Sequence, residues 1–424
     1  MLDYRDHYIH EHMYEGLTGL ELESQRIDQN GNLAHTPHPF PGDKYIDRDF
    51  GEAQTEISAG VADTVEGALD IMHGELTKLH RRLKENGELL WPFSNPPVIK
   101  DEEDIVIAQY SGEKQSSYDY RVYLAGKYGR YKMTYSGIHF NYSFSDDILR
   151  RGAGLSGAED FAEYKNRFYL DLAERVLEYS WVPVALMAAS PVADGSLFDK
   201  RCARESSFTG FATLRCSDFG YWNTFVPSIS YENIRSHVHS MQIYVERGLL
   251  IAARELYYPV RLKPPGAYTV EALAEKGVEH IELRMIDVNP YAQDEMDIRD
   301  LRFLQFFLIW LSSLPHRHLD ENEQMQAIYN HKASAQYSWS IARIALPGKM
   351  PVTLEQGIAE VLDEMSEFFN GEAKAQADID YQKNKLKNKE LRYAHQVRRD
   401  YRDHYIEKGL RRAKEIQDSF TKDE

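Results

Sequence analysis

The stretch Gly19-Leu20-Glu21-Leu22-Glu23-Ser24-Gln25-Arg26-Ile27-Asp28 alternates with a period of two residues, and this pattern predicts a β-strand. The turn signal Asn30-Gly31-Asn32 follows it directly. Successive residues of a strand point to opposite faces of a sheet, so Glu21 and Glu23 are expected on the same face. The chain is therefore expected to build a sheet with acidic side chains on one side.

Two later segments show a similar alternation of polar and apolar residues. In the segment 132–145, Phe140 falls on one face of the predicted strand and His139 on the other. In the segment 280–288, Leu283 and Glu282 are divided in the same way. These strands are otherwise lined by hydrophobic residues, which indicates that their polar side chains converge on an interior cleft.

Helical periodicity covers most of the remaining chain. Apolar spacing predicts helices over residues 61–85, 159–179, 231–255, 297–314, 321–344, 353–369 and 376–416. No strand is predicted after Pro290. No Pro/Gly/Ser-rich linker divides the chain, so we expect one integrated domain over residues 1–424, with a helical C-terminal region at 315–424.

The amino-acid composition limits the classes of molecule that this chain is expected to bind. The chain has 67 acidic and 50 basic residues and a net charge of −17, which argues against binding to nucleic acid or to anionic membranes. The longest near-apolar run, 301–314, is shorter than the roughly 20 residues that span a bilayer. Cys202 and Cys216 lie in no reactive motif, so we expect inert thiols in a reducing cytoplasm.

The acidic residues suggest a metal site. Burying several carboxylates together is unfavourable unless cations neutralise them. Mg²⁺ is the natural counter-charge because it is a hard cation that shares oxygen ligands with phosphates. A histidine in the set leaves Mn²⁺ open as well. The candidate ligands are Glu21, Glu23, Asp49, Glu52, Glu56, His139 and Glu282.

Each of these patterns also has a simpler interpretation. Glu21 and Glu23 alone fit the solvated face of a strand. Asp49, Glu52 and Glu56 alone fit the wet side of a helix, because spacings of three and four residues share a helical face. The spacing of the charges by itself leaves the function undecided.

Collinear sequence blocks carry more information than any single motif. They include Glu21-Leu-Glu23-Ser-Gln-Arg26, Asp49-Phe50-Gly-Glu52-Ala-Gln-Thr-Glu56, Ser136-Gly137-Ile138-His139-Phe140-Asn141, Leu214-Arg215-Cys-Ser217-Asp218-Phe-Gly220-Tyr221, Glu255-Leu256-Tyr257-Tyr258-Pro259-Val260-Arg261 and Gly277-Val278-Glu279-His-Ile281-Glu282-Leu-Arg284. In this order they resemble blocks of bacterial glutamate–cysteine ligases, including the ligase half of bifunctional glutathione synthases. The resemblance covers about residues 19–314.

The resemblance implies an α+β fold like that of glutamine synthetase. In it, a curved, largely antiparallel sheet with surrounding helices holds ATP and metal ions on its concave face. Residues 1–314 would form the family-like catalytic core. The implied reaction is ATP-dependent formation of γ-glutamylcysteine from glutamate and cysteine through a γ-glutamyl phosphate, the first step of glutathione biosynthesis.

The resemblance also implies roles for individual residues. The metal ligands would be Glu21, Glu23, Asp49, Glu56, His139 and Glu282, with Glu52 as a further candidate. Arg284 and Arg261 would stabilise the transferred phosphoryl group, and Arg215 would anchor a substrate carboxylate. The acceptor pocket would be lined by Phe50, Tyr120, Leu124, Tyr221 and Tyr257, with Arg121 nearby.

Some features depart from the family pattern. Leu22 stands between the two acids where many relatives carry arginine, and little after residue 314 can be matched. No second ATP-grasp module is visible, so we expect the dipeptide as product and not glutathione. Two alternatives stay open: a related ligase that uses another amine, and a non-catalytic binding homologue.

Overall fold

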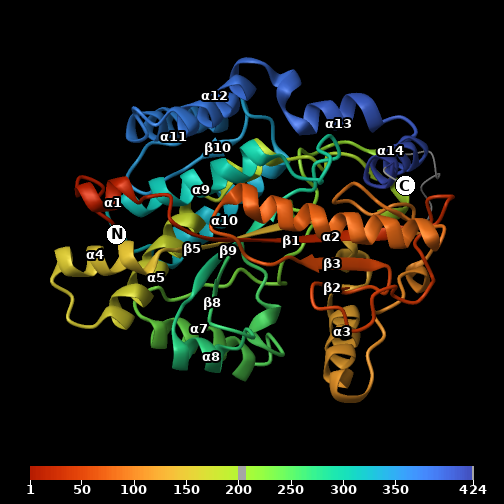
Figure 1. Ribbon diagram of the computed structural model, residues 1–424, viewed down its shortest axis with the longest axis horizontal. Helices are drawn as coiled ribbons and strands as arrows, with labels where there is room; N and C mark the ends of the chain where they lie inside the picture. The colour runs from red at the N-terminus through yellow and green to blue at the C-terminus, as the bar shows by residue number, and fades with distance from the viewer. Residues whose placement is uncertain (199–206, 423–424) are drawn as a thin grey trace.

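The computed structural model describes residues 1–198 and 207–422, so Cys202 lies outside the described residues. Its centre is an antiparallel sheet (Figure 1). In spatial order the strands are β2 (Ile46–Arg48), β3 (Gln54–Ser58), β1 (Gly16–Ile27), β5 (Ile138–Phe144), β9 (His280–Ile286) and β8 (Val260–Lys263). A short strand, β4 (Leu89–Leu90), pairs with the end of β1. The predicted α+β fold with a largely antiparallel sheet is confirmed.

The two faces of this sheet differ in chemistry. On β1, the buried side chains of Leu20 and Leu22 lie on the face opposite to Glu21 and Glu23. The register sets Glu21 opposite His139 on β5. One face is therefore apolar and the other carries the acids, as the alternation predicts.

Helices cover the apolar face. They are α2 (Val65–Glu85), α5 (Phe161–Tyr179), α6 (Trp181–Met187) and α9 (Ile298–Ser313). Met72, Leu76 and Leu79 of α2 are fully buried because their spacing places them on one side of the helix. In α9 nearly every residue from Leu301 to Ser312 is buried, since this helix lies between α2, α5 and the C-terminal helices.

Other elements flank the polar face. They are α3 (Gln115–Tyr128), α7 (Ile234–Glu246) and α8 (Val270–Lys276), which lie below the sheet in Figure 1, opposite α9. Short elements complete this part of the chain: α1 (His7–Glu11), α4 (Asp146–Ser156), β6 (Ala193–Asp194) and β7 (Ser207–Phe208). The polar face is therefore left as the floor of a space between flanking helices.

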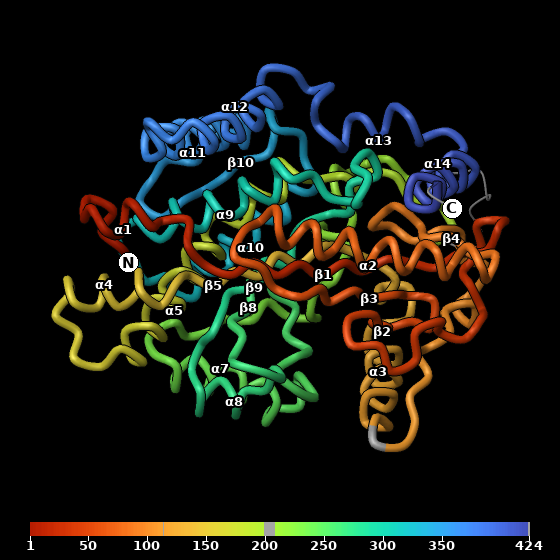
Figure 2. The backbone as a smooth tube through the Cα atoms, in the orientation of Figure 1, coloured from red at the N-terminus to blue at the C-terminus, as the bar shows by residue number. Residues whose placement is uncertain are grey.

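The C-terminal region runs back over the helical layer. It comprises α10 (Glu321–Gln336), β10 (Arg343–Ile344), β11 (Val352–Thr353), α11 (Leu354–Phe368), α12 (Ala373–Lys387), α13 (Tyr393–Tyr401) and α14 (Tyr405–Thr421). Figure 2 shows the later part of this segment, from α11 to α14, in blue along the top of the molecule, ending beside α2. Helix α12 packs against α9, and α14 packs against α2 and β4. Among the described residues, no helix is long and apolar enough to cross a membrane.

Several predicted boundaries are wrong. The helix predicted over 231–255 ends at Glu246, because Gly248 takes a left-handed turn with φ 70°. The helix predicted over 321–344 ends at Gln336, and a β10–β11 hairpin follows in a region where no strand was predicted. The strand predicted over 132–145 begins only at Ile138, after a 3-10 turn.

The helix predicted over 376–416 is also wrong, because the chain forms three separate helices there. It breaks at Asn388, and again at His404, which has a positive φ of 64°. Helices α13 and α14 are amphipathic on their own, whereas the buried residues of α12 include Asp378, Gln382 and Lys385, so apolar periodicity alone does not locate the breaks.

A buried ion pair anchors the end of β1. Arg26 is fully buried and donates to Glu88 Oε2 at 2.8 Å. Its second guanidinium nitrogen donates to the carbonyl oxygens of Glu52 (2.9 Å) and Thr36 (3.0 Å). These bonds tie β1 to the two loops that flank it.

We expect Arg26→Met to lower the free energy of unfolding by about 3–5 kcal/mol, because it leaves Glu88 as an unpaired buried charge. Urea unfolding followed by circular dichroism measures the change. The control Arg82→Met breaks an exposed pair with Glu85 and should cost less than about 1 kcal/mol. Equally small changes in the two variants would contradict the anchoring role of Arg26.

Candidate active site

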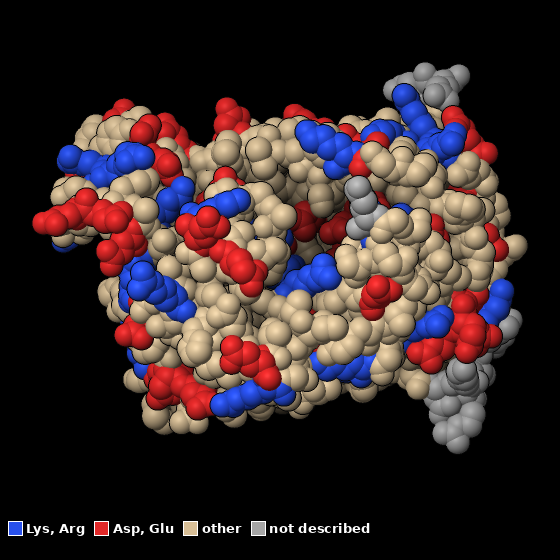
Figure 3. Space-filling view, turned by 90° about the horizontal axis from the view of Figure 1, so that it is seen from below, with Lys and Arg blue, Asp and Glu red and all other residues tan. Residues whose placement is uncertain are grey.

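The polar face of the sheet forms the floor of a cavity of about 290 Å³. Figure 3 shows the hollow from below, with acidic side chains inside it and basic side chains at its edge. With the exception of Glu52, the residues predicted for metal, phosphoryl and substrate contacts line it: Glu21, Glu23, Asp49, Phe50, Glu56, Tyr120, Arg121, Leu124, His139, Arg215, Tyr221, Tyr257, Arg261, Glu282 and Arg284. These positions are spread over more than half of the sequence, and the fold brings them to one place.

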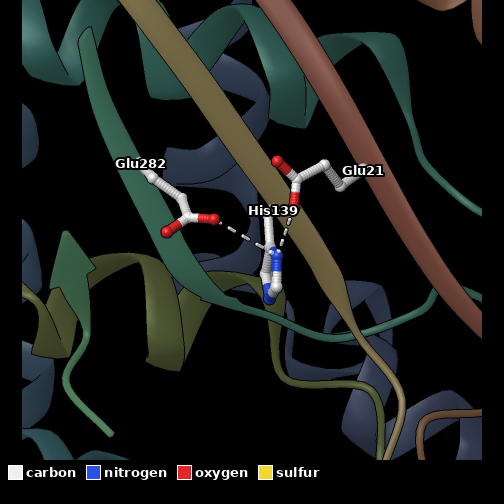
Figure 4. A group of neighbouring side chains, drawn as sticks. All are labelled: Glu21, His139 and Glu282. Atoms are coloured by element: carbon white, nitrogen blue, oxygen red, sulfur yellow. Dashed lines mark hydrogen bonds and ion pairs between the residues drawn. The ribbon is translucent and has the colours of Figure 1, made fainter. Parts of the chain in front are cut away.

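Three side chains meet at the centre of the floor (Figure 4). Glu21 comes from β1, His139 from β5 and Glu282 from β9. His139 Nδ1 lies 2.8 Å from Glu21 Oε2 and 3.6 Å from Glu282 Oε1. One ligand atom from each of the three residues lies within 4.8 Å of the others, which is close enough to share a cation.

A second group of acids lies beside this centre. The register sets Glu23 on β1 opposite Glu56 on β3, and both border the cavity with Asp49. Burial and the neighbouring Asp49 carboxylate raise the pKa of Glu23 well above its usual value. The same two causes raise the pKa of Glu56 to about 8. Without a cation, the protein therefore favours protonated carboxyl groups at Glu23 and Glu56. A bound cation would displace these protons.

Basic side chains surround Glu282. Arg284 donates to Glu282 Oε2 at 3.0 Å, Lys263 Nζ lies 3.2 Å from Oε1, and Arg261 lies 3.5 Å from Oε2. Burial alone would raise the pKa of Glu282, but these cations lower it well below its usual value. Lys263 was not predicted, although its position two residues after Arg261 on β8 places it on the same face.

The central group fits a divalent cation. His139 Nε2 and Glu282 Oε1 are buried, and within the described part of the chain neither has a hydrogen-bond partner. Burial, with help from Arg284, lowers the pKa of His139, so the imidazole is neutral and can act as a ligand. Carboxylate oxygens form the rest of the set and suit a hard cation.

Glu52, the remaining candidate metal ligand, does not line the cavity. Its carboxylate accepts hydrogen bonds from the backbone amides of His38 (2.9 Å) and Gln109 (2.8 Å) and pairs with Arg48. These bonds hold two loops against the turn before β3. The interpretation of residues 49–56 as a helix is also wrong, because Gln54–Ser58 forms β3.

Aromatic residues form another wall of the cavity. The rings of Tyr221 and Tyr257 lie 5.2 Å apart with an edge-to-face geometry, and Tyr257 Oη is buried without a hydrogen-bond partner among the described residues. Phe50 and Leu124 are buried beside them. This wall is largely apolar, and it includes the Tyr257 hydroxyl, which has no hydrogen-bond partner among the described residues.

The two arginines at this wall, Arg121 and Arg215, differ in how many of their N–H donors are engaged in hydrogen bonds. Arg121 donates all of its bonds to backbone carbonyl oxygens, namely those of Asp49, Ser117 and Arg48. Arg215 is buried, and within the described part of the chain its guanidinium donates one hydrogen bond to a backbone carbonyl, that of Ile286, at 3.3 Å. Arg121 therefore supports the wall, whereas most donors of Arg215 stay available.

The one cysteine among the described residues lines the cavity without being reactive. Cys216 is buried, and its thiol donates to the carbonyl oxygen of Met285 at 3.4 Å. Burial raises the pKa of Cys216 to about 12, so it is a neutral thiol at physiological pH. The expectation of an inert thiol is met at this position.

Solved structures share this architecture. A glutamate–cysteine ligase from Francisella tularensis, solved in complex with AMP, superposes with a TM-score of 0.84 at 22% identity, over 96% of this chain and 89% of that chain. A bifunctional glutathione synthetase from Pasteurella multocida superposes with a TM-score of 0.83 at 24% identity, over 98% of this chain and 54% of that chain. These likenesses establish the fold.

Comparison of the sequence with known families identifies the family of this chain. The chain belongs to the glutamate–cysteine ligase family, whose model matches residues 3–248 and 224–334. It is 34% identical to a glutathione biosynthesis bifunctional protein from Listeria monocytogenes, over 95% of this chain and 54% of the relative. It is 30% identical to a glutamate–cysteine ligase from Clostridium acetobutylicum, over 78% of this chain and 79% of the relative. The chain thus spans about half the length of its bifunctional relatives.

The raised carboxyl pKa values predict that cation binding is linked to proton release. A cation must displace the proton of Glu56, so Mn²⁺ affinity should increase with pH and level off above about 8. The increase is at most about tenfold per pH unit for each proton released. Electron paramagnetic resonance of free Mn²⁺ measures the affinity.

Glu56→Gln is the matched variant, because it keeps the shape of the side chain and removes its titration. We expect weaker Mn²⁺ binding in this variant, with a smaller dependence on pH. An affinity of the unaltered protein that does not change between pH 6 and pH 9 would contradict the linkage.

Proposed function

We propose that this chain is a glutamate–cysteine ligase that uses ATP and Mg²⁺ to form γ-glutamylcysteine, the first step of glutathione biosynthesis. The observation that carries the proposal is the convergence of the predicted acids, arginines and aromatic residues on one cavity of a family member. The proposal covers the dipeptide step alone. Glutamate, cysteine and ATP are its small-molecule partners.

The proposed metal ligands are the acids and the histidine of the cavity floor. They are Glu21, Glu23, Asp49, Glu56, His139 and Glu282. Mg²⁺ bound there would offset the negative charge of the ATP phosphates, and Mn²⁺ could replace it. The buried His139 Nε2, which has no hydrogen-bond partner among the described residues, supports this use of the site.

The γ-carboxylate of glutamate must be activated, because its negative charge repels the attacking amine and its oxygen is a poor leaving group. In the first step, a γ-carboxylate oxygen of glutamate attacks the γ-phosphorus of ATP, and ADP leaves. The product is an acyl phosphate, in which the carbonyl carbon carries a good leaving group. In the second step, the amine attacks this carbon, phosphate leaves and the nitrogen loses a proton. The sum is an amide, ADP and phosphate.

Arg284 and Arg261 are the proposed stabilisers of the transferred phosphoryl group. Both contact the buried Glu282 carboxylate, which fixes their guanidinium groups at the cavity floor. Fixed positive charge stabilises the charge on the transferred group without reorganisation during the reaction. Glu282 therefore orients the two arginines as well as serving as a proposed metal ligand.

Arg215 is the proposed anchor for the α-carboxylate of glutamate. A Cβ atom at Gly137 would lie 2.1 Å from Arg215 Cζ, so the absence of a side chain at residue 137 makes room for the guanidinium. Packing against this glycine orients the fork of donors that a carboxylate accepts.

The acceptor would lie against the aromatic wall. Phe50, Tyr120, Leu124, Tyr221 and Tyr257 offer a small, partly apolar surface that suits a short thiol side chain. Arg121 supports this wall through its bonds to backbone carbonyls. A cytoplasmic location, where ATP and reduced cysteine are present, belongs to the same proposal, as does the absence of nucleic-acid and membrane partners.

The experiment that tests the proposal measures ADP release with glutamate, ATP and Mg²⁺ while the acceptor is varied. We expect turnover with cysteine, weaker turnover with other amino acids, and none without glutamate. Mass spectrometry should identify γ-glutamylcysteine as the product.

Glu282→Gln is the matched variant, since it keeps the shape of the side chain and removes its charge. Turnover should fall by several orders of magnitude, because both arginines and the cation lose a partner. Circular dichroism checks that the variant is folded. If no acceptor stimulates ADP release by the unaltered protein, the ligase proposal fails; if an unrelated amine is the best acceptor, the cysteine assignment fails.

A further inference from the structure

We infer that Arg254 binds the α-carboxylate of the acceptor, so that this site selects an amino acid over a simple amine. The inference rests on the proposed function, and it adds a residue that the sequence analysis did not select. Arg254 is exposed, and it lines the cavity between the aromatic wall and solvent.

The positive charges in the cavity differ in how the protein engages them. Lysine and arginine side chains line it at six positions: Arg121, Arg215, Arg254, Arg261, Lys263 and Arg284. Three of these surround Glu282, and Arg121 is bonded to three backbone carbonyls. Within the described residues, only Arg215 and Arg254 of this set have neither a carboxylate partner nor a hydrogen bond from each guanidinium nitrogen to a backbone carbonyl.

The proposed substrates bring permanent carboxylates of their own. Glutamate keeps its α-carboxylate throughout the reaction, and Arg215 is proposed to bind it. An amino-acid acceptor brings a second α-carboxylate, whereas a simple amine brings none. Two available guanidinium groups therefore match two permanent carboxylates.

The position of Arg254 assigns it to the acceptor and not to glutamate. Its guanidinium carbon lies 3.9 Å from the centre of the Tyr120 ring, on the aromatic wall. A guanidinium stacked on a ring keeps its N–H donors in its own plane, where they can form two parallel bonds to a carboxylate. The group is thus held beside the proposed acceptor pocket with its donors free.

Neighbouring contacts fix the segment that carries Arg254. The next residue, Glu255, is fully buried and accepts hydrogen bonds from Lys127 Nζ (2.5 Å) and Tyr128 Oη (2.7 Å) at the end of α3. It also accepts from the backbone amide of Ile251 at 2.7 Å. Because α3 also carries Tyr120, these bonds hold the ring and the guanidinium on connected elements.

The test compares two acceptors that differ only in the carboxylate. 2-Aminobutyrate and propylamine share the same carbon chain and amine, and neither carries a thiol. We expect the unaltered protein to prefer 2-aminobutyrate. In Arg254→Gln, the KM for 2-aminobutyrate and for cysteine should rise roughly ten- to a hundredfold, the effect of losing a charged hydrogen-bond donor. The kinetics with propylamine, and the KM for glutamate and for ATP, should not change.

Two further variants complete the design. Arg254→Lys keeps the charge and loses the planar fork, so it should recover part of the affinity for 2-aminobutyrate. Arg247→Gln is the control, because Arg247 is an exposed arginine nearby in the chain that does not line the cavity. It should leave all of these constants unchanged.

The outcomes separate this inference from the proposed function. Turnover with amino acids that is unaffected in Arg254→Gln, an equal loss with propylamine, or a rise in the KM for ATP or glutamate would overturn the role of Arg254 alone. A failure of every acceptor to stimulate the unaltered protein would overturn the ligase proposal, and the inference with it.

Discussion

The antiparallel pairing of β1, β5 and β9 is the constraint on which the site depends. It sets Glu21 opposite His139, sets Asn141 opposite Glu282, and turns the charged side chains of all three strands to one face. A shift of one residue in either pairing would move the acids into the apolar layer under α2 and α9. The hydrophobic packing of the other face therefore fixes the register, and the register fixes the chemistry.

This arrangement places charges where water is scarce, and the surrounding residues determine how each is accommodated. Glu282 stays ionised because Arg284, Lys263 and Arg261 surround it, whereas Glu23 and Glu56 hold protons in the absence of a cation. A cation and a nucleotide would bring the missing opposite charges together. The proposed cation and nucleotide would therefore balance charges that the protein leaves unbalanced in this site.

Sequence predicted the parts of this account that depend on period and chemical type. The period of two on residues 19–28 is enough to place Glu21 and Glu23 on one face of a strand. The matched order of the sequence blocks is enough to assign Arg215 and Arg284 to the same site. The breaks near Gly248 and Asn388 were missed because apolar spacing does not encode the backbone conformation that ends each helix. The engagement of Arg121 with backbone carbonyls, and the stacking of Arg254 on Tyr120, depend on contacts between distant segments, which no local pattern encodes.

The central claim is that the γ-carboxylate of glutamate is phosphorylated before the amine attacks. The most direct measurement follows oxygen-18 from the γ-carboxylate of labelled glutamate during turnover with ATP and the best acceptor. The account predicts one labelled oxygen in each phosphate released, because the acyl phosphate is cleaved at its carbon–oxygen bond. Phosphate without label, formed together with the amide, would contradict this mechanism.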